Sequence, residues 1–296
     1  MSNVPPELQG FTVVNLGSGG DAPFVIPPWA GTGSTIVEID AADRPVGSAG
    51  NYERRVTLSD VIAGSEGSRT FTTRAFVSVS GLLEPKHELI AKYGVEREFA
   101  AVERTTVKTS TLPSLLAQEG IERVDLLKTD LEGLDFEVLM SCGALLDGGL
   151  CIRCELRFEP FYEGEPKIHH ALATLDGRGF DLQSLMTETW QPAAPWREQL
   201  VVRQDGQTTW ADCILLKRLA PGDLAGRARQ VVLLSGLGQR SVAGYILSTI
   251  AAAIPPRWNE LLTPLVMPPP PISRPRRIVR AARRRARELR AARTDH

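Results

Sequence analysis

The chain has 296 residues, of which 43% are hydrophobic and 23% are charged, and its formal net charge is −1. These values are typical of globular proteins and exclude a chain that is disordered, collagen-like or coiled-coil throughout. At roughly 100–200 residues per domain, the length allows one large domain with an appendage and a sizeable buried core.

Short apolar runs predict strands in the first third of the chain. They cover 11–16 (FTVVNL), 34–39 (STIVEI) and part of 54–62, and a β-like stretch follows over 69–76. Residues 82–104 are mixed and charged, which predicts either a helix or an ordered loop.

The middle of the chain alternates between apolar runs and segments with apolar residues at helical spacing. This alternation predicts an α/β fold with a parallel sheet that helices cover on both faces. The predicted helices cover 112–119, 134–146 and 168–177, the predicted strands cover 124–129, 151–156, 180–185 and 211–217, and a loop rich in Pro and Trp covers 190–197.

The character of the sequence changes after Arg218. Residues 223–265 are predicted to be helical, and 267–275 contain five prolines, which favour a polyproline II spacer. An Arg-rich segment follows as a short helix candidate. We therefore expect a main domain over 1–220, a helical extension over 221–266, and a Pro-rich linker with an Arg-rich tail over 267–296.

The net charge conceals a division between the body and the tail. Residues 274–296 hold ten Arg against Glu288 and Asp295, which leaves 24 basic and 33 acidic residues in the rest of the chain. Such a tail is either solvated and disordered or docks on an anionic membrane surface or a partner. The acidic body and the absence of aromatic residues in the tail disfavour nucleic acid.

Four cysteines are too few for a disulfide framework, and the first residues (MSNVPPELQGF) show no secretory pattern. No apolar run reaches the roughly 18 residues of a membrane span. We therefore expect a cytoplasmic protein, with any membrane contact being peripheral and at the inner face. Cys151 and Cys154 should point to opposite faces of one strand, which favours core thiols over a zinc site.

Three strand ends predict a nucleotide-type ligand site, because open α/β sheets bind ligands beyond the carboxyl ends of their strands. Gly17 and Gly19 lie in NLGSGGD after the first strand, where they permit close approach to the backbone. Asp40 ends the second strand and is suited to a ribose diol, while Ile62 in the 60–63 segment is suited to an adenine. A plain turn and a solvated acid remain the alternatives for the glycines and for Asp40.

The segment VDLLKTDLEGLDFEVL (124–139) places Asp130 at the end of a strand, with Glu132 and Gly133 before a helix. These acids are interpreted either as ligand-facing groups or as helix caps. Glu155 lies on the next predicted strand, and His169 opens a later helix, where it is either a base or a polar helix start.

The sequence LLKTDLEGLDFEVL resembles the hallmark motif of the FkbM family of S-adenosylmethionine-dependent methyltransferases. VSGLLEP (79–85), TSTLPSLLAQEGIERVDLLKTD (109–130) and CELRFEPFYEGEP (154–166) also resemble family segments, and the resemblance covers about residues 11–217. It implies a class I methyltransferase (Rossmann-like) fold, with a mostly parallel sheet and one antiparallel strand near the edge. It also implies methyl transfer from S-adenosyl-L-methionine, typically to a hydroxyl of a glycan or secondary metabolite.

Carried over from the family, Gly17 and Gly19 match the cofactor loop and Asp40 matches the ribose acid. Asp130 and Glu132 match the acidic motif. The family has Asp where this chain has Asn15, which can form hydrogen bonds but supplies no charge. Pro23, Pro27 and Pro28 occupy the first crossover, so we expect a loop or stunted helix there. A non-catalytic relative that serves as a binding or scaffold protein is therefore the second interpretation.

Methyl transfer to a hydroxyl requires alignment of the acceptor and removal of its proton. Asp130 is the first candidate for the base or the orienting group, Glu155 is the second, and His169 is the third. Glu132 and Tyr162 are expected to contact the acceptor, although aromatic residues of the 158–166 loop also suit a local cap. The acids permit a divalent cation such as Mg²⁺ without requiring one.

Overall fold

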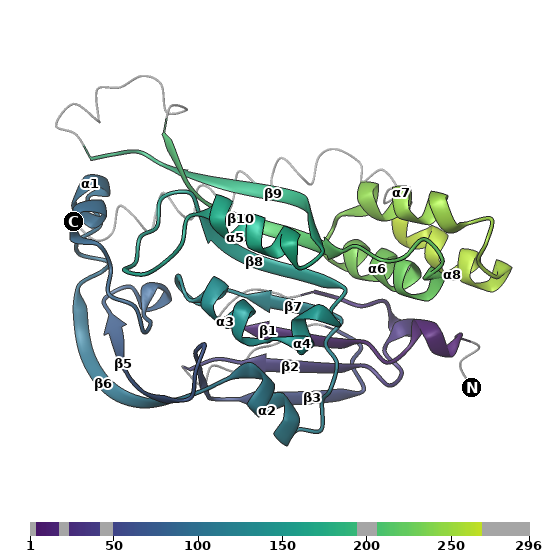
Figure 1. Ribbon diagram of the computed structural model, residues 1–296, viewed down its shortest axis with the longest axis horizontal. Coiled ribbons are helices and arrows are strands. Elements are labelled where there is room, and N and C mark those ends of the chain that lie inside the picture. The colour runs from purple at the N-terminus through teal and green to yellow at the C-terminus, as the bar shows by residue number, and fades with distance from the viewer. Residues whose placement is uncertain (1–3, 18–23, 42–49, 194–205, 268–296) are drawn as a thin grey trace, which may run out of the picture.

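The computed structural model describes residues 4–17, 24–41, 50–193 and 206–267 (Figure 1). Within them, seven strands form one sheet in the order β3-β2-β1-β7-β8-β10-β9. Strand β10 is antiparallel to both of its neighbours, and the other strands run parallel to one another. The strands are β1 (Thr12–Leu16), β2 (Thr35–Ile39), β3 (Arg54–Leu58), β7 (Leu126–Thr129), β8 (Cys151–Arg157), β9 (Phe180–Trp190) and β10 (Gln207–Lys217).

This order confirms the predicted α/β fold, with a mostly parallel sheet and one antiparallel strand near an edge. The predicted strand positions are also confirmed, although β9 and β10 are longer than their apolar runs. The added residues of β9 are mostly exposed, so no hydrophobic pattern marks them.

Four helices cover one face of the sheet (Figure 1): α2 (Leu112–Gln118), α3 (Asp135–Ser141), α4 (Ala144–Asp147) and α5 (Ile168–Gly177). Their apolar side chains share a core with Val14, Val37 and Ile152 of the sheet. The helix predicted over 134–146 is divided into α3 and α4, because Gly143 adopts a φ of +51° between them.

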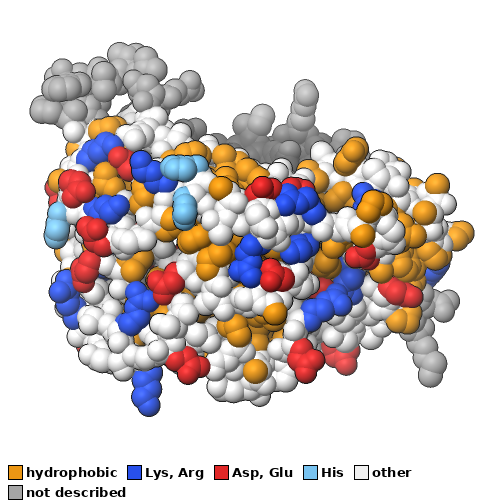
Figure 2. All heavy atoms as spheres, in the orientation of Figure 1, with side chains coloured by type: hydrophobic (Ala, Val, Ile, Leu, Met, Phe, Trp, Pro, Cys, Tyr) orange, Lys and Arg blue, Asp and Glu red, His pale blue; other side chains and the backbone are white. Residues whose placement is uncertain are grey.

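The opposite face is covered by α6 (Leu224–Gly236), α7 (Arg240–Ile250) and α8 (Pro256–Val266), which share a second core with the sheet. Cys151 belongs to this core and Cys154 to the first, as strand alternation predicted, and both are buried free thiols. Figure 2 shows hydrophobic side chains gathered over the α7 and α8 end, and mixed charges over the remainder of this view.

A second, three-stranded sheet lies at the carboxyl ends of the parallel strands (Figure 1). It contains β4 (Val61–Ile62), β6 (Ala101–Ser110) and β5 (Gly67–Arg74) in that order. A short 3-10 helix, η3 (Val77–Val79), and α1 (His87–Tyr93) connect β5 to β6. The sequence predicted a helix or loop over 82–104 but missed β6, whose first six residues are all exposed.

Two further 3-10 helices precede β1 and β2, namely η1 (Pro6–Leu8) and η2 (Pro28–Ala30). In the described part of the first crossover, η2 is the single helical turn, which agrees with the stunted helix that the prolines predicted. Gly19, residues 194–197 of the predicted loop, and the tail from residue 268 lie outside the described residues. No helix within the described ranges is long and apolar enough to cross a membrane.

Candidate functional site

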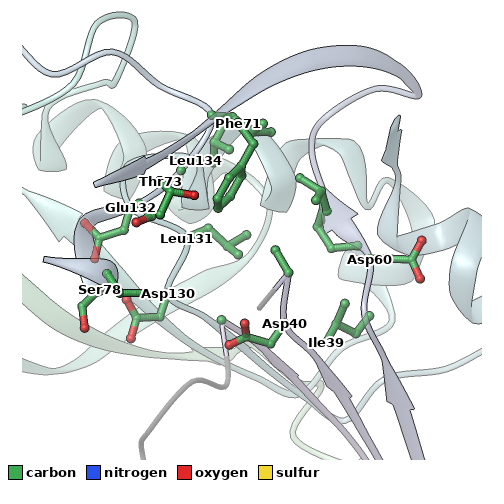
Figure 3. Close-up of a pocket in the computed structure, with 18 residues that line it drawn as sticks. Ile39, Asp40, Asp60, Phe71, Thr73, Ser78, Asp130, Leu131, Glu132 and Leu134 are labelled. Carbon is green, nitrogen blue, oxygen red and sulfur yellow. The ribbon is translucent and has the colours of Figure 1, made fainter. Parts of the chain in front are cut away.

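A cavity of about 560 Å³ opens where β1, β2 and β7 end, next to the small sheet (Figure 3). The structure brings five of the predicted site residues together in its wall: Gly17, Asp40, Ile62, Asp130 and Glu132. Gly17, Asp40, Asp130 and Glu132 follow parallel strands, and they meet because the carboxyl ends of such strands share one edge of the sheet. Ile62 comes from β4 of the small sheet.

The floor of the cavity is the junction between the ends of β1 and β7. Gly17 adopts a φ of +66°, and a Cβ at this position would lie 1.9 Å from the backbone oxygen of Asp130. Lys128 Nζ donates to the Gly17 carbonyl and to Asp130 Oδ2, each at 3.2 Å. Glycine is therefore required here by both the conformation and the close approach, and the lysine fixes the Asp130 carboxylate.

One wall is suited to an adenosine. Ile39 and Ile62 present apolar surface to the cavity, and Asp40 presents a carboxylate, whereas the Asp60 carboxylate points away and accepts a hydrogen bond from Ser110 (Figure 3). The Asp40 amide donates to the Leu58 carbonyl at 3.2 Å, which holds this turn against β3. A carboxylate beside an apolar slot matches the hydrogen-bonding and stacking needs of a ribose and its base.

The opposite wall contains hydroxyl groups from Thr73 of β5, Ser78 of η3, and Ser80. Buried Arg74 holds this wall in place, because its guanidinium donates to the carbonyl oxygens of Val79 at 3.1 Å and Leu83 at 2.7 Å. The segment that bears these hydroxyl groups is therefore held in place by hydrogen bonds from Arg74.

Glu132 faces this wall from an unusual backbone conformation. Its φ is +50°, and among the described non-glycine residues it is the only one with a positive φ. Its Oε2 accepts hydrogen bonds from the Tyr162 hydroxyl at 2.8 Å and from Arg157 Nη2 at 3.1 Å. Burial, opposed by Arg157 and reinforced by Asp130, raises the pKa of Glu132 to about 7.

Arg157 is a buried residue of β8 that the sequence analysis missed. Besides Glu132, it pairs with Glu155 at 2.7 Å and with Glu165 at 3.1 Å. Burial raises the pKa of Glu165 to about 7 and holds that of Glu155 well above its usual value. The signal was present in RCELRFEP, where strand alternation places Glu155 and Arg157 on one face, but Glu165 arrives from a separate loop.

Glu155 does not line the cavity, because its carboxylate is directed to Arg157. His169 does not line it either. The apolar face of α5 (Ile168, Ala171 and Leu175) packs on the sheet, which leaves His169 exposed to solvent. The structure therefore does not support His169 as a base at this site.

Tyr162 is buried rather than presented to the cavity, with 1% of its surface exposed. Its ring lies 6.1 Å from that of Phe99, in a cluster with Tyr93 and Phe161. The aromatic loop is thus a local cap rather than a stacking platform for a sugar, and the contribution of Tyr162 to the site is its hydroxyl.

Asn15 belongs to β1, two residues before Gly17; it is 1% exposed and is not among the residues that line the cavity. Neither its amide nitrogen nor its amide oxygen has a hydrogen-bond partner among the described residues. A buried, unpaired amide beside the glycine turn is a donor and acceptor for a polar ligand, so the residues present fit a cofactor at this end. Within the described ranges, no group of three or more His, Cys, Asp and Glu residues is arranged to hold a metal ion.

A protein-family model matches the part of the chain that contains the acidic motif around Asp130 and Glu132. The profile of the methyltransferase FkbM domain matches residues 41–182, a range that contains Asp130 and Glu132. No curated protein and no solved structure significantly matches the chain. Residues 41–182 therefore match a methyltransferase FkbM domain.

Proposed function

We propose that this protein transfers a methyl group from S-adenosylmethionine to a hydroxyl of a small-molecule or glycan acceptor. The observation that carries the proposal is the meeting of Gly17, Asp40 and Asp130 in one cavity at the edge of the sheet. The family match supports methyl transfer as the class of reaction.

Residues on two sides of the cavity would hold the cofactor. Asp40 would accept hydrogen bonds from the ribose hydroxyls, and Ile39 and Ile62 would flank the base. Asn15 and Gly17 would contribute an amide and open backbone to the amino-acid portion. When bound, the cofactor supplies a methyl group on a sulfonium, which is a good leaving group.

The acceptor would lie against the wall that carries hydroxyl groups. In Figure 3, Asp130 lies between Asp40 and Glu132, so it borders both halves of the cavity. We assign Asp130 to orientation of the acceptor hydroxyl and Glu132 to removal of its proton. A carboxyl with a pKa near 7 is well matched to accept a proton at neutral pH, and such a base accelerates reactions by about 10²–10⁴-fold.

A second function is favoured by Asn15, which replaces the acid of the family pattern and carries no charge. Under this alternative, the chain is a non-catalytic binding protein that retains the fold. The two functions differ in cofactor binding, because only the methyltransferase requires S-adenosylmethionine in the cavity.

Calorimetric titration of an Asp40→Asn variant with S-adenosylhomocysteine tests the assignment of the cofactor wall. Loss of the ribose contacts is expected to weaken binding by about tenfold or more, since a hydrogen bond to a charged group contributes roughly 1.5–3 kcal/mol. Glu122→Gln, which removes the same charge at an exposed position outside the cavity, is the control and should bind as the wild type does. Equal affinity in both variants would contradict the assignment.

A further inference from the structure

The Glu132 side chain reaches the cavity from a backbone conformation that needs external support. A non-glycine residue at φ +50° is strained, and such residues persist where the surrounding structure holds them in place. The next residue, Gly133, has a φ of +90°, and a Cβ there would lie 2.8 Å from the Tyr162 ring. The turn is therefore pressed directly against Tyr162.

Two buried side chains, those of Tyr162 and Arg157, donate hydrogen bonds to the Glu132 carboxylate. The Tyr162 hydroxyl and Arg157 Nη2 both bond to Oε2, at 2.8 and 3.1 Å. Arg157 is itself held by Glu155 and Glu165, and its guanidinium lies 5.5 Å from the centre of the Tyr162 ring. Both groups are buried, so their bonds to Glu132 are shielded from water.

Tyr162 is held in turn by residues 84–86, which follow the hydroxyl-bearing wall along the chain. The amide of Lys86 donates to the Phe161 carbonyl at 2.8 Å, and the amide of Glu163 donates to the Glu84 carbonyl at 2.9 Å. An antiparallel bridge joins Pro85 to Tyr162 between these bonds. The Tyr162 hydroxyl consequently has little freedom to leave Glu132.

We infer that Tyr162 and Arg157 are positioning residues that hold Glu132 as an ionised carboxylate facing the acceptor side of the cavity. The inference rests on the proposed function, in which Glu132 accepts the proton. The neighbouring carboxylates raise the pKa of Glu132. Without the two donors on Oε2, the side chain would therefore remain protonated up to a higher pH. Several charged and titratable groups lie close enough to influence the charge of Glu132, Tyr162 or Arg157. Besides those three residues, they are Asp130, Asp135, Glu155, Glu165 and Arg74.

The chain offers a matched pair of variants for the test. Tyr162→Phe removes the hydroxyl that bonds to Glu132 and keeps the ring. Tyr93→Phe makes the same change in the same aromatic cluster, but the Tyr93 hydroxyl bonds to Glu159 instead. Any general effect of losing a buried hydroxyl should appear in both variants.

The measurement is a carbon-13 NMR titration of the glutamate carboxyl groups, with Glu132→Gln used to assign the Glu132 signal. The Tyr162→Phe variant should move the Glu132 midpoint upward by about one pH unit, because a charge-assisted hydrogen bond is lost. The Tyr93→Phe variant should leave it unchanged. An unmoved midpoint in Tyr162→Phe, or an equal movement in both variants, would overturn the inference.

This titration needs no cofactor, so it is independent of the proposed function. Calorimetry of the same variants with S-adenosylhomocysteine tests that function separately. Absence of binding in the wild type would remove the methyltransferase assignment, whereas the NMR midpoints alone decide whether the two residues hold Glu132 ionised.

Discussion

The turn after β1 requires glycine at position 17 for two reasons, the positive φ and the close approach to the Asp130 backbone. Gly17→Ala would force a methyl group to 1.9 Å from the Asp130 carbonyl oxygen and would place alanine at φ +66°. We expect the variant to lose more than about 2 kcal/mol of unfolding free energy, measured by chemical denaturation, because backbone strain and a clash combine.

Gly120→Ala is the matched control. Gly120 has a φ of +68°, but nothing lies within 4 Å of the added Cβ, so only the backbone cost of about 1–2 kcal/mol remains. If the two variants lost equal unfolding free energy, the close approach of Gly17 to Asp130 would not contribute to the requirement for glycine.

Individual site residues could be predicted when strand ends marked them. Gly17, Asp40 and Asp130 each follow a short apolar run, and the edge of a parallel sheet brings such positions together. Arg157 could not be assigned in the same way, because its partners arrive from a turn and a loop that only the folded chain aligns. His169 does not line the cavity, because the apolar face of its helix packs on the sheet and leaves His169 exposed to solvent.

Among the elements, α6 is attached to the sheet through a buried ion pair. Arg229 donates to Asp125 Oδ2 at 2.7 Å and to the Gln9 carbonyl at 2.6 Å, and its guanidinium lies 4.0 Å from the centre of the Phe11 ring. The arginine thus connects the helix to the segments that lead into the central strands β1 and β7.

Arg229→Ala should lower the unfolding free energy by about 1.5–3 kcal/mol, because it removes the buried one of the two arginines that pair with Asp125 and leaves the more exposed Arg123. Arg227→Ala, two residues earlier on α6 and only partly buried, should change it by less than about 0.5 kcal/mol. Similar losses in the two variants, measured by urea denaturation, would show that the ion pair does not anchor the helix.

The elements themselves could be predicted wherever one face was apolar. The helices after residue 223 and the central strands have such faces, and they were found. Strand β6 was missed because its first six residues are exposed, which leaves no alternation to detect. The division between α3 and α4 depends on a local φ at Gly143, which hydrophobic spacing does not encode.

At the scale of the whole molecule, buried carboxyl groups make the folded state less stable as the pH rises. Burial raises the pKa of Glu132 and Glu165 to about 7 and that of Asp135 to about 6. The folded state therefore binds protons more tightly than the unfolded state, whose carboxyls titrate near 4. This contribution is fully present at acid pH and is lost as the pH rises from about 4 through 7.

Glu165→Gln should reduce the fall in melting temperature between pH 5 and pH 8, because it removes one of these groups. Its share is at most about 3 kcal/mol, from a displacement of the pKa from 4.5 to about 7. Glu163→Gln, at an exposed position in the same loop, should follow the wild-type curve. Parallel curves for Glu165→Gln and the wild type would contradict the pH dependence assigned to this group.

The overall topology was the most predictable feature, because alternating strands and helices allow few arrangements. The family resemblance supplied the antiparallel strand, which local patterns do not specify. The packing of α6, α7 and α8 into the same core as the sheet could not be predicted, since it depends on contacts between residues more than 100 positions apart, such as Arg229 and Asp125.

The central claim is that the cavity binds S-adenosylmethionine despite Asn15. Isothermal titration calorimetry of the wild-type chain with this cofactor tests it most directly. The claim predicts one site per chain, with a dissociation constant in the micromolar range. No heat of binding and no rise in melting temperature at millimolar cofactor would contradict it and leave the non-catalytic binding protein as the better description.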